Sequence, residues 1–322
     1  MNPTKLKLAL PLLVALAYGP DLALASTILG PNLTSFTVLG AQQVTNVSPS
    51  SIVGNVGVSP GSAITGFSAS TPGVPTPDAT GQVTGGNLHA TTTFGGAGTP
   101  NAADAQAELT AARLNLDSLG SGYLLASDLT LAGILLPGVY KVPYGITNLS
   151  GALTLDGQGN ANAAWVFQMD SSLITSPASS VNVINTGAGA GVYWNVRSSA
   201  TIDTTTAFMG NILALTSIWM YTGATDLCGR ALADNGEVTL QMNRLSGVCS
   251  GELTGSNGLS GGFDVTSTGE VEFLPFAPVN GGGTVPEPAT LALTLVGLLG
   301  LASTRARRAA PFETRVNGRF VR

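Results

Sequence analysis

Residues 165–242 carry one short pattern four times: VFQMDSS (166–172), WNVRSSAT (194–201), NILALTSIW (211–219) and RALADNGEVTL (230–240). Each copy alternates small apolar residues, passes a polar step and ends on a second apolar pair. Short alternating runs broken by Gly, Ser and Thr favour strands over helices. A unit of this length cannot close a core of its own and must stack on its neighbours. The stretch therefore predicts a β-solenoid with irregular coils, a fold that presents flat, regularly spaced surfaces.

The composition suits tightly wound strands and turns. Only 10% of the 322 residues are charged, and 42 residues are glycine. The low charge argues against a disordered chain, because disorder requires low hydrophobicity and high net charge. Residues 26–286 hold five basic and fifteen acidic side chains, a net charge of about −10. This surface would repel phosphate backbones, so we expect no nucleic-acid partner. The acids are scattered singly and are expected to keep the surface soluble.

The first 25 residues have the three-part pattern of a secretory signal peptide. Lys5 and Lys7 precede an apolar run at 8–18, and the tripeptide Ala-Leu-Ala ends at Ala25. The run is too short to span a bilayer, and small residues at this spacing form a signal-peptidase site. We expect cleavage after Ala25 and export of the remaining chain.

Residues 285–308 carry a second address signal, in which a Pro-Glu-Pro motif precedes an apolar run at 289–302 and three arginines follow. The motif residues are Pro286, Glu287, Pro288, Arg305, Arg307 and Arg308. As a helix the run would reach about 21 Å, short of the ~30 Å hydrocarbon core, and the arginines would stay cytoplasmic. The segment resembles the PEP-CTERM sorting signal of Gram-negative bacteria. That resemblance implies transient membrane insertion, cleavage by an exosortase, and release to the cell surface or exopolysaccharide matrix. The tail 309–322 is longer than such signals usually carry.

The two cysteines, Cys228 and Cys249, lie 21 residues apart. In an oxidising exported setting a disulfide between them is expected, with two buried free thiols as the alternative. On the loop-closure model this bond would stabilise the fold by ~3 kcal/mol. One histidine and two cysteines make no zinc constellation, so we expect neither a metal nor another cofactor.

One solenoid domain is predicted over residues 26–250. Within it, residues 67–100 are rich in proline and glycine and predict an irregular cap over an open end of the solenoid. Residues 101–119 predict the one clear helix, with Asn101 as its N-cap and an Ala- and Leu-rich stripe that packs along a sheet. Residues 251–284 are Gly- and Ser-rich and predict a linker.

Several motifs, taken in order, resemble the microbial ice-binding protein family. They are ILG (28–30), SFTVLG (35–40), GNVGVSPG (54–61), AQAEL (105–109), LPGVY (136–140), WVFQ (165–168), GNILALTSI (210–218) and GRALA (229–233). The resemblance implies a mainly β fold: an irregular, discontinuous right-handed β-solenoid of triangular cross-section with one α-helix packed alongside. It also implies that one flat Thr- and Ser-rich face binds the ice surface, without enzymatic activity, as in antifreeze or recrystallisation-inhibiting proteins.

The family often carries T-A/G-x-T steps on its ice face, and this chain has two that fit and two that fit less well. The candidate ice-binding residues are Ser62, Thr65, Ser176, Ser179, Thr204, Thr206, Thr222 and Thr225. Threonine suits such a face because its hydroxyl orders a water, its methyl excludes one, and its χ1 angle is stiff. The alternative is that these side chains serve only as turn and strand residues of the solenoid.

Another column of outward positions aligns Thr154, Ile174, Thr201, Trp219 and Thr239. Where the family tends to have Thr, this chain has Ile174 and Trp219, with an aromatic residue, Tyr221, two positions after the tryptophan. A protruding tryptophan would interrupt a flat hydroxyl grid. Either this column lies off the ice face, or ice affinity is weak, or the surface contacts carbohydrate or protein; packing of Trp219 under the cap is a further alternative.

Two other classes of function are alternatives to ice binding. β-Helices include polysaccharide lyases and hydrolases, but His89 has no evident partner and the aspartates fall at expected coil corners, so we expect no enzyme. A cell-surface or exopolysaccharide-matrix adhesion protein that binds carbohydrate or protein is the alternative function, and the sorting signal favours it directly.

Overall fold

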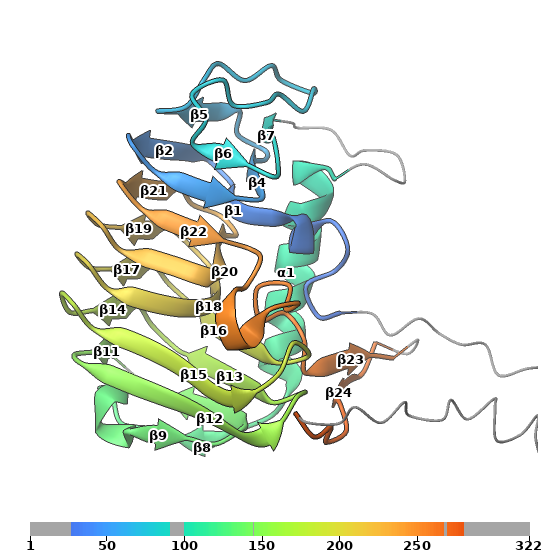
Figure 1. Cartoon of the computed structure of the whole chain (residues 1–322), viewed down its shortest axis with the longest axis vertical. Coiled ribbons are helices and arrows are strands. Elements are labelled where there is room, and N and C mark those ends of the chain that lie inside the picture. The colour runs from blue at the N-terminus through green and yellow to red at the C-terminus, as the bar shows by residue number, and fades with distance from the viewer. Residues whose placement is uncertain (1–26, 91–99, 144, 267–268, 280–322) are drawn as a thin grey trace, which may run out of the picture. The chain divides into compact units, whose positions relative to one another are not determined.

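The alternating runs of the sequence form parallel strands that stack coil upon coil (Figure 1). The computed structural model describes residues 27–90, 100–143, 145–266 and 269–279. In these residues the strands form one sheet of fifteen strands, one of seven and a two-stranded pair. Every strand pairing in the two large sheets is parallel. The mainly β prediction with one α-helix is confirmed, whereas the right-handed sense and the triangular cross-section stay predictions.

The elements have the following bounds. The fifteen-stranded sheet contains β1 (Phe36–Gly40), β3 (Ser51–Val53), β4 (Asn55–Val58), β6 (Val83–Thr84), β7 (Leu88–Ala90), β8 (Tyr123–Leu124), β9 (Ile134–Leu135), β10 (Gly138–Val142), β12 (Ala152–Asn160), β13 (Ala164–Met169), β15 (Ser180–Thr186), β16 (Gly191–Val196), β18 (Ala207–Ala214), β20 (Thr225–Ala233) and β22 (Arg244–Ser246). The seven-stranded sheet contains, in stacking order, β11 (Thr147–Leu149), β14 (Leu173–Thr175), β17 (Ala200–Ile202), β19 (Ile218–Met220), β21 (Val238–Gln241), β2 (Gln43–Val47) and β5 (Ala63–Thr65). The two-stranded pair is β23 (Phe263–Val265) with β24 (Val271–Phe273), and the helices are α1 (Ala102–Ser118), η1 (Leu33–Ser35), η2 (Leu129–Ala132) and η3 (Gly251–Leu253).

Stacking order departs from chain order where the two ends of the domain meet. Strands β20 and β21, late in the chain, pair with β1 and β2 near its start. The N-terminal coils therefore continue the stack that the C-terminal coils leave open, and the expected discontinuity is present. Figure 1 shows this as blue strands placed directly on orange ones.

The fifteen-stranded sheet covers two sides of the stack because its longer strands bend. In β18, Ala207 pairs with β15, whereas the segment that begins at Asn211 pairs with β16. Strand β20 follows the same path beside β18. One side includes β10, β13, β16, the second halves of these bent strands, β1 and β4, and it faces α1 (Figure 1).

Two apolar clusters hold the stack together. The inner cluster contains a column of aromatic rings from successive coils, Tyr140, Phe167, Trp194 and Phe208, with centroids 5.6, 4.0 and 5.0 Å apart. The outer cluster lies between α1 and the sheet, where the predicted stripe of the helix packs on Val166, Tyr193 and their neighbours. Asn101 accepts from the amides of Ala103 and Asp104, so the expected N-cap is present.

Polar contacts fix the helix at its place on the sheet. Arg113 donates to the Asp234 carboxylate at 2.8 Å, and both side chains are buried. Asn195 and Gln168 donate to the backbone carbonyls of Arg113 and Leu116. These bonds satisfy groups that the helix buries against the sheet, since an unpaired buried polar group is destabilising.

The predicted cap contains more regular structure than its Pro/Gly content indicated. Its described part, residues 67–90, includes β6 and β7, which pair with β3 and β4. Asp78 organises the turn before β6 by accepting from the amides of Ser68, Thr80 and other residues. The hydroxyl of Thr80 and these amides hold the pKa of Asp78 at about 2, against the opposing effect of its partial burial. This segment therefore forms a further coil of the stack. The local hydrogen bonds that order it cannot be read from the number of prolines and glycines.

Where the sequence predicted a linker over 251–284, the structure places packed elements up to Val279. Phe263 in β23 belongs to the outer apolar cluster, and the amide of Val279 donates to Gly159. The signal segment 1–25, the sorting segment 285–308 and the tail 309–322 lie outside the described residues. Within the described ranges, α1 and the short 3₁₀ turns lack the length and hydropathy that crossing a membrane requires.

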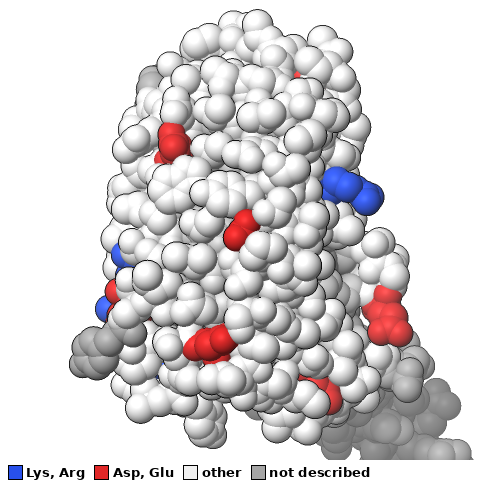
Figure 2. All heavy atoms as spheres, turned by 90° about the vertical axis from the view of Figure 1, so that its left-hand side faces the viewer, with Lys and Arg blue, Asp and Glu red and all other residues white. Residues whose placement is uncertain are grey.

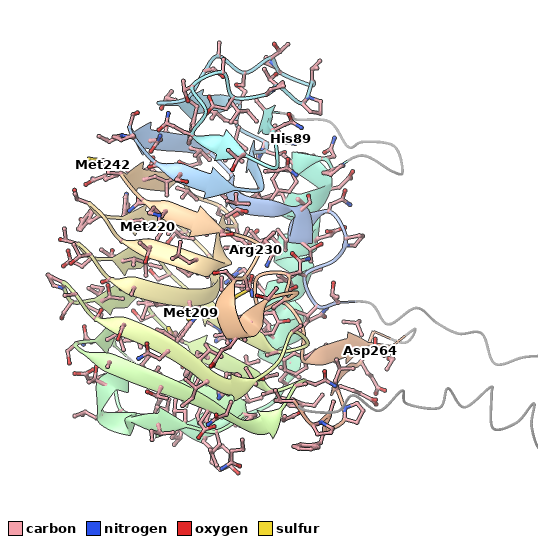
Figure 3. All side chains as sticks on the ribbon, viewed as in Figure 1. His89, Met209, Met220, Arg230, Met242 and Asp264 are labelled. Atoms are coloured by element: carbon pink, nitrogen blue, oxygen red, sulfur yellow. A yellow bond between two sulfur atoms is a disulfide. The ribbon has the colours of Figure 1, made fainter. Side chains whose placement is uncertain are left out.

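Arg230 lies inside the domain (Figure 3) and joins its own strand, β20, to three other parts of the chain. Its guanidinium donates to the carbonyl of Thr34, to the side chain of Asn211, and to Asn257 and the carbonyl of Gly258. Burial lowers its pKa to about 10, so it remains charged at neutral pH. It therefore ties the N-terminal turn, a middle coil and the C-terminal loop together.

The predicted disulfide between Cys228 and Cys249 is present. Cys228 lies on β20 and Cys249 lies just before η3, so the bond fastens the C-terminal loop to the coil that also carries Arg230. Both cysteines are buried in the inner apolar cluster.

Replacing Arg230 by Met should lower the free energy of unfolding by about 3 kcal/mol or more, because buried carbonyls would lose their donor. Urea denaturation measures this change. Arg244→Met is the matched control, since Arg244 is exposed, and it should change stability by less than about 0.5 kcal/mol. Equal effects of both substitutions would contradict the role assigned to Arg230.

His89 should make the stability depend on pH. Its ring is buried against Phe36, its Nε2 lies 3.1 Å from Asn55 Oδ1, and burial lowers its pKa from 6.5 to about 4. The unfolded chain therefore binds a proton at higher pH than the folded one, so stability is full above pH 6.5 and falls as pH drops towards 4. Thermal unfolding between pH 7 and 4 should show this loss, and it should be smaller in His89→Asn.

Candidate functional site

The seven-stranded sheet is the regular surface of this domain. Its pairings run without a register shift. The fifteen-stranded sheet shifts register in β1, β12 and β18. Outward side chains of the seven strands therefore form straight columns along the stack, at the ~4.8 Å spacing of neighbouring strands.

The middle column runs through all seven strands. In stacking order it contains Asn148, Ile174, Thr201, Trp219, Thr239, Thr45 and Thr65. The residues on either side of each position are mostly buried. Because strand side chains alternate between faces, this burial fixes the column on the solvent side.

Three threonines follow one another at the upper end of this column, on β21, β2 and β5. We refer to Thr239, Thr45 and Thr65 as the threonine ladder. Their hydroxyls make no side-chain hydrogen bond to any described residue, and Thr65 is exposed while the other two are partly exposed. Each rung therefore has a side chain that reaches solvent, a hydroxyl not engaged by another side chain, and a stiff χ1 angle.

A second column beside the ladder is tied together along the stack. The amide of Ser217 donates to Ser199 Oγ at 3.4 Å, and the amide of Glu237 donates to Ser217 Oγ at 3.2 Å. Gln43 then donates to Glu237 Oε2 at 2.5 Å. These bonds hold the column's side chains in fixed orientations, so this part of the face is pre-ordered.

Trp219 is part of the face rather than a projection from it. Its indole N–H donates at 3.3 Å to Oε1 of Glu237, which directly precedes the neighbouring strand β21, and the side chain is partly buried. The sequence correctly predicts that Trp219 separates Thr201 from the threonines above it. Of the alternatives that the sequence left open, free protrusion does not apply, because this hydrogen bond holds the indole beside Glu237.

The predicted column contains one error of position. Thr154 lies on β12, where it pairs with Asn182 in the fifteen-stranded sheet. The position in the seven-stranded sheet belongs to Asn148. Thr154 stands between two leucines, which is the alternation of apolar and polar residues expected of a strand. Asn148 follows a buried polar residue, Thr147, so its segment shows this alternation less clearly.

The predicted site residues divide between the face, its margin and the interior. Thr65 is a rung of the ladder, and Ser62 lies just before β5 and is exposed. Ser176 follows β14 directly. Thr204 and Thr222 lie in the turns after β17 and β19, where their hydroxyls donate to Asp203 and Gln241. These three residues line the margin of the seven-stranded sheet.

Ser179 and Thr206 lie in the interior, with exposures of 2% and 0%. Their hydroxyls are 3.3 Å apart, and Thr206 also contacts the hydroxyl of Thr175 at 3.0 Å. The preceding residues, Ala178 and Thr205, have φ angles of 60° and 55°, and this left-handed step turns the next side chain inward. The two side chains therefore cannot contact an external surface.

Thr225, the remaining predicted residue, begins β20 and belongs to the other large sheet, where it pairs with Arg244. Thr45 was missed by sequence reasoning. The only local signal was the alternation in β2, because its place beside Thr239 results from the discontinuous stacking order.

The face carries little charge. The seven strands contain no charged residue; Glu237 and Asp203 adjoin β21 and β17. Figure 2 shows the corresponding side of the domain, with isolated charged groups among uncharged ones. Such a surface favours contact with an uncharged, ordered partner over an ionic ligand.

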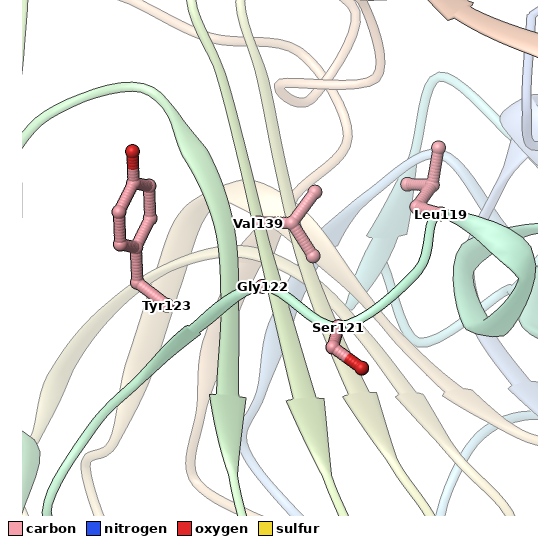
Figure 4. A pocket seen from close by; sticks show the side chains of 5 residues that line it. All are labelled: Leu119, Ser121, Gly122, Tyr123 and Val139. Atoms are coloured by element: carbon pink, nitrogen blue, oxygen red, sulfur yellow. The ribbon is translucent and has the colours of Figure 1, made fainter.

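The cavities and ionisable clusters of the described residues offer no comparable site. A cavity of about 330 Å³ lies beyond the end of α1 and is lined by Leu119, Ser121, Gly122, Tyr123 and Val139 (Figure 4). These side chains include no acid, base or thiol suited to nucleophilic or acid–base chemistry at neutral pH. In the described ranges no three His, Cys, Asp or Glu residues lie close enough to hold a metal ion.

Comparison with known proteins gives consistent results. A family model described as Ice-binding-like matches residues 38–246. An ice-binding protein of Nostoc sp. (strain HG1) is 42% identical over 217 residues, which cover 67% of this chain and 72% of that protein. An ice-binding protein of Flavobacterium frigoris (strain PS1) is 33% identical over 138 residues, but the match covers only 46% of its length.

Solved structures agree with this result. An ice-binding protein from an Arctic yeast superimposes with a TM-score of 0.59 at 26% identity, covering 69% of this chain and 94% of that chain. An ice-binding protein from an Antarctic biological consortium gives 0.56 at 30% identity, covering 69% and 91%.

Proposed function

The chain belongs to the Ice-binding-like family, and we propose on that basis that it is an exported ice-binding protein that contacts ice through the seven-stranded sheet. One observation carries the choice of face: its seven strands pair without a register shift and present three consecutive threonines with unengaged hydroxyls. The fifteen-stranded sheet is interrupted by register shifts and is partly covered by α1.

The physics of the face suits a crystalline partner. Ice presents a rigid, repeating array of water molecules, and the ladder repeats at the strand spacing. The threonines are stiff, and the hydrogen-bonded column beside them (Ser199, Ser217, Glu237 and Gln43) is already ordered. Both therefore lose little conformational entropy when they bind. Water ordered by the hydroxyls can join the lattice while the methyl groups exclude disordered water. Adsorption of this kind would slow ice growth or recrystallisation, and we assign the chain no catalytic activity.

The threonine ladder forms the centre of the proposed site. Thr201 extends it below Trp219, and Ser62, Ser176, Thr204 and Thr222 form its margin. Ile174 and Asn148 occupy the lower end of the middle column, where the hydroxyl pattern stops. The proposed area of contact is therefore smaller than the whole sheet.

The terminal segments support export and surface delivery. The pattern of residues 1–25 favours signal cleavage, and the Pro-Glu-Pro motif with its apolar run and arginines favours exosortase processing after transient membrane insertion. We propose release to the cell surface or exopolysaccharide matrix of a Gram-negative bacterium. Ice binding at that location would hold the matrix at an ice surface.

Thr45→Tyr and Thr65→Tyr should each reduce ice activity several-fold, because a large ring lifts the face off the lattice. Both side chains reach solvent, so the melting temperature should stay within about 2 °C. Thermal hysteresis and recrystallisation of a sucrose–ice slurry measure the activity.

Thr154→Tyr and Thr225→Tyr are the matched controls, since both threonines lie on the fifteen-stranded sheet, and both variants should keep full activity. Loss of activity in the controls but not in the ladder variants would move the site to that sheet. Unfaceted round ice discs that grow freely in the wild-type protein would refute ice binding altogether.

Intact mass and terminal sequencing of the protein released by its native host should give Ser26 as the first residue and loss of the arginines after position 302. Pro286→Ala with Glu287→Ala should leave the chain associated with the membrane fraction. Mature protein that retains Arg305, Arg307 and Arg308 would contradict the proposed sorting.

A further inference from the structure

Two aromatic side chains lie side by side on the seven-stranded face. Trp219 and Tyr221 are alternate residues of one strand segment, and Met220 between them is fully buried. The amide of Tyr221 donates to Ile202 and continues the ladder of β19, so both side chains lie on the outward side of the sheet. Tyr221 is 40% exposed. We call these two residues the aromatic patch.

Hydrogen-bonding side chains border the patch above and below. Thr201 and Asp203 flank it on the β17 side, and Thr239 and Gln241 flank it on the β21 side. Asp203 uses Oδ1 for the amide and hydroxyl of Thr204. Its Oδ2, the amide nitrogen of Gln241 and the hydroxyl of Tyr221 bond no other described group. Unused donors and acceptors therefore border both aromatic side chains.

We propose that the aromatic patch binds a chain of neutral pyranose sugars, at a site separate from the threonine ladder. The apolar C–H face of a pyranose ring stacks on an aromatic ring, while its equatorial hydroxyls point outward in the plane of the ring. On this face those hydroxyls meet Asp203 and Gln241. Because Glu237 fixes the indole of Trp219, less side-chain entropy is lost on binding.

Charge selects an uncharged sugar. The patch is bordered by Asp203, with Glu237 one strand away, and the seven strands carry no Lys or Arg. Uronates, sulfated sugars and phosphates would be repelled at short range. A protein partner fits less well, because stable protein interfaces place an extended apolar core around their aromatic anchors, whereas polar and hydroxyl side chains border this patch.

The patch also differs from the ladder in the groups that can hydrogen-bond to water. Trp219 occupies a column position that threonine fills at Thr201, Thr239, Thr45 and Thr65, and its ring provides no hydroxyl for an ice lattice. The face is thus divided between the threonine ladder on β21, β2 and β5 and the aromatic patch on β19. The two sites make independent predictions.

Tryptophan fluorescence gives a direct test, because Trp165 and Trp194 are completely buried and Trp219 is the remaining tryptophan of the chain. Adding cellohexaose, a soluble neutral β-glucan fragment, should shift the emission to shorter wavelength and protect it from quenching by acrylamide. The change should saturate with concentration and vanish in Trp219→Phe. A wild-type emission that does not respond would overturn the proposal.

Co-sedimentation with microcrystalline cellulose measures binding independently of fluorescence. Trp219→Ala and Tyr221→Ala should each weaken retention roughly ten-fold, the loss expected for one stacked ring. Trp219→Phe should remain bound, because it keeps a stacking ring. Tyr123→Ala is the matched control: Tyr123 is a 74% exposed tyrosine on β8, and its loss should leave retention unchanged.

The remaining measurements separate this proposal from the proposed ice site. Thr45→Tyr should keep glucan binding while losing ice activity, and Tyr221→Ala should keep ice activity while losing glucan binding. Retention of both Trp219→Ala and Tyr221→Ala at wild-type levels would refute the aromatic patch, whatever the ice assays show. Equal binding of wild type to alginate, an anionic polysaccharide, would refute selection of neutral sugars.

Discussion

The parallel backbone ladder between successive coils is the constraint on which this structure depends. A single coil has too few apolar side chains to exclude water from its own backbone, so it is stable only when its strands pair with the coils above and below. In-register pairing stacks like residues on like residues, as in the ring column of Tyr140, Phe167 and Trp194. The same register, read on the solvent side, produces the straight columns of the seven-stranded face.

Discontinuous stacking gives the structure a joint that a continuous solenoid would not need. Strands β1 and β2 enter beside β20 and β21, so the N-terminal segment has to be held by contacts distant in sequence. Arg230 and the Cys228–Cys249 disulfide lie at this joint, and the guanidinium reaches the carbonyl of Thr34, 196 residues away. Buried charge is tolerated there because almost every donor of the side chain is used. The upper part of the functional face is built across this joint.

The seven-stranded sheet presents two different surfaces. Its backbone geometry is the same in both parts, and only the outward side chains differ. Strands β19 and β21 pair in register, and in each the two residues that flank the outward position are buried, yet one strand presents Trp219 and the other Thr239. Threonine makes a water-ordering rung, and tryptophan, fixed by Glu237, makes a stacking surface. An ice-binding protein exported to a polysaccharide-rich surface would be held there by the aromatic patch and would bind ice through the threonine ladder.

Local sequence determined the strand type, the helix with its Asn101 cap, the disulfide pair and most of the middle column, because alternation and turn residues act over a few positions. It did not determine which side of a turn each hydroxyl faces, so Ser179 and Thr206 were expected outside and lie inside. It also left Thr45 out of the site and put Thr154 in the position of Asn148. The reason is physical: left-handed turn residues and the insertion of N-terminal strands beside β21 are settled by packing between segments far apart in the chain. Tertiary structure alone therefore assembled the threonine ladder from β21, β2 and β5.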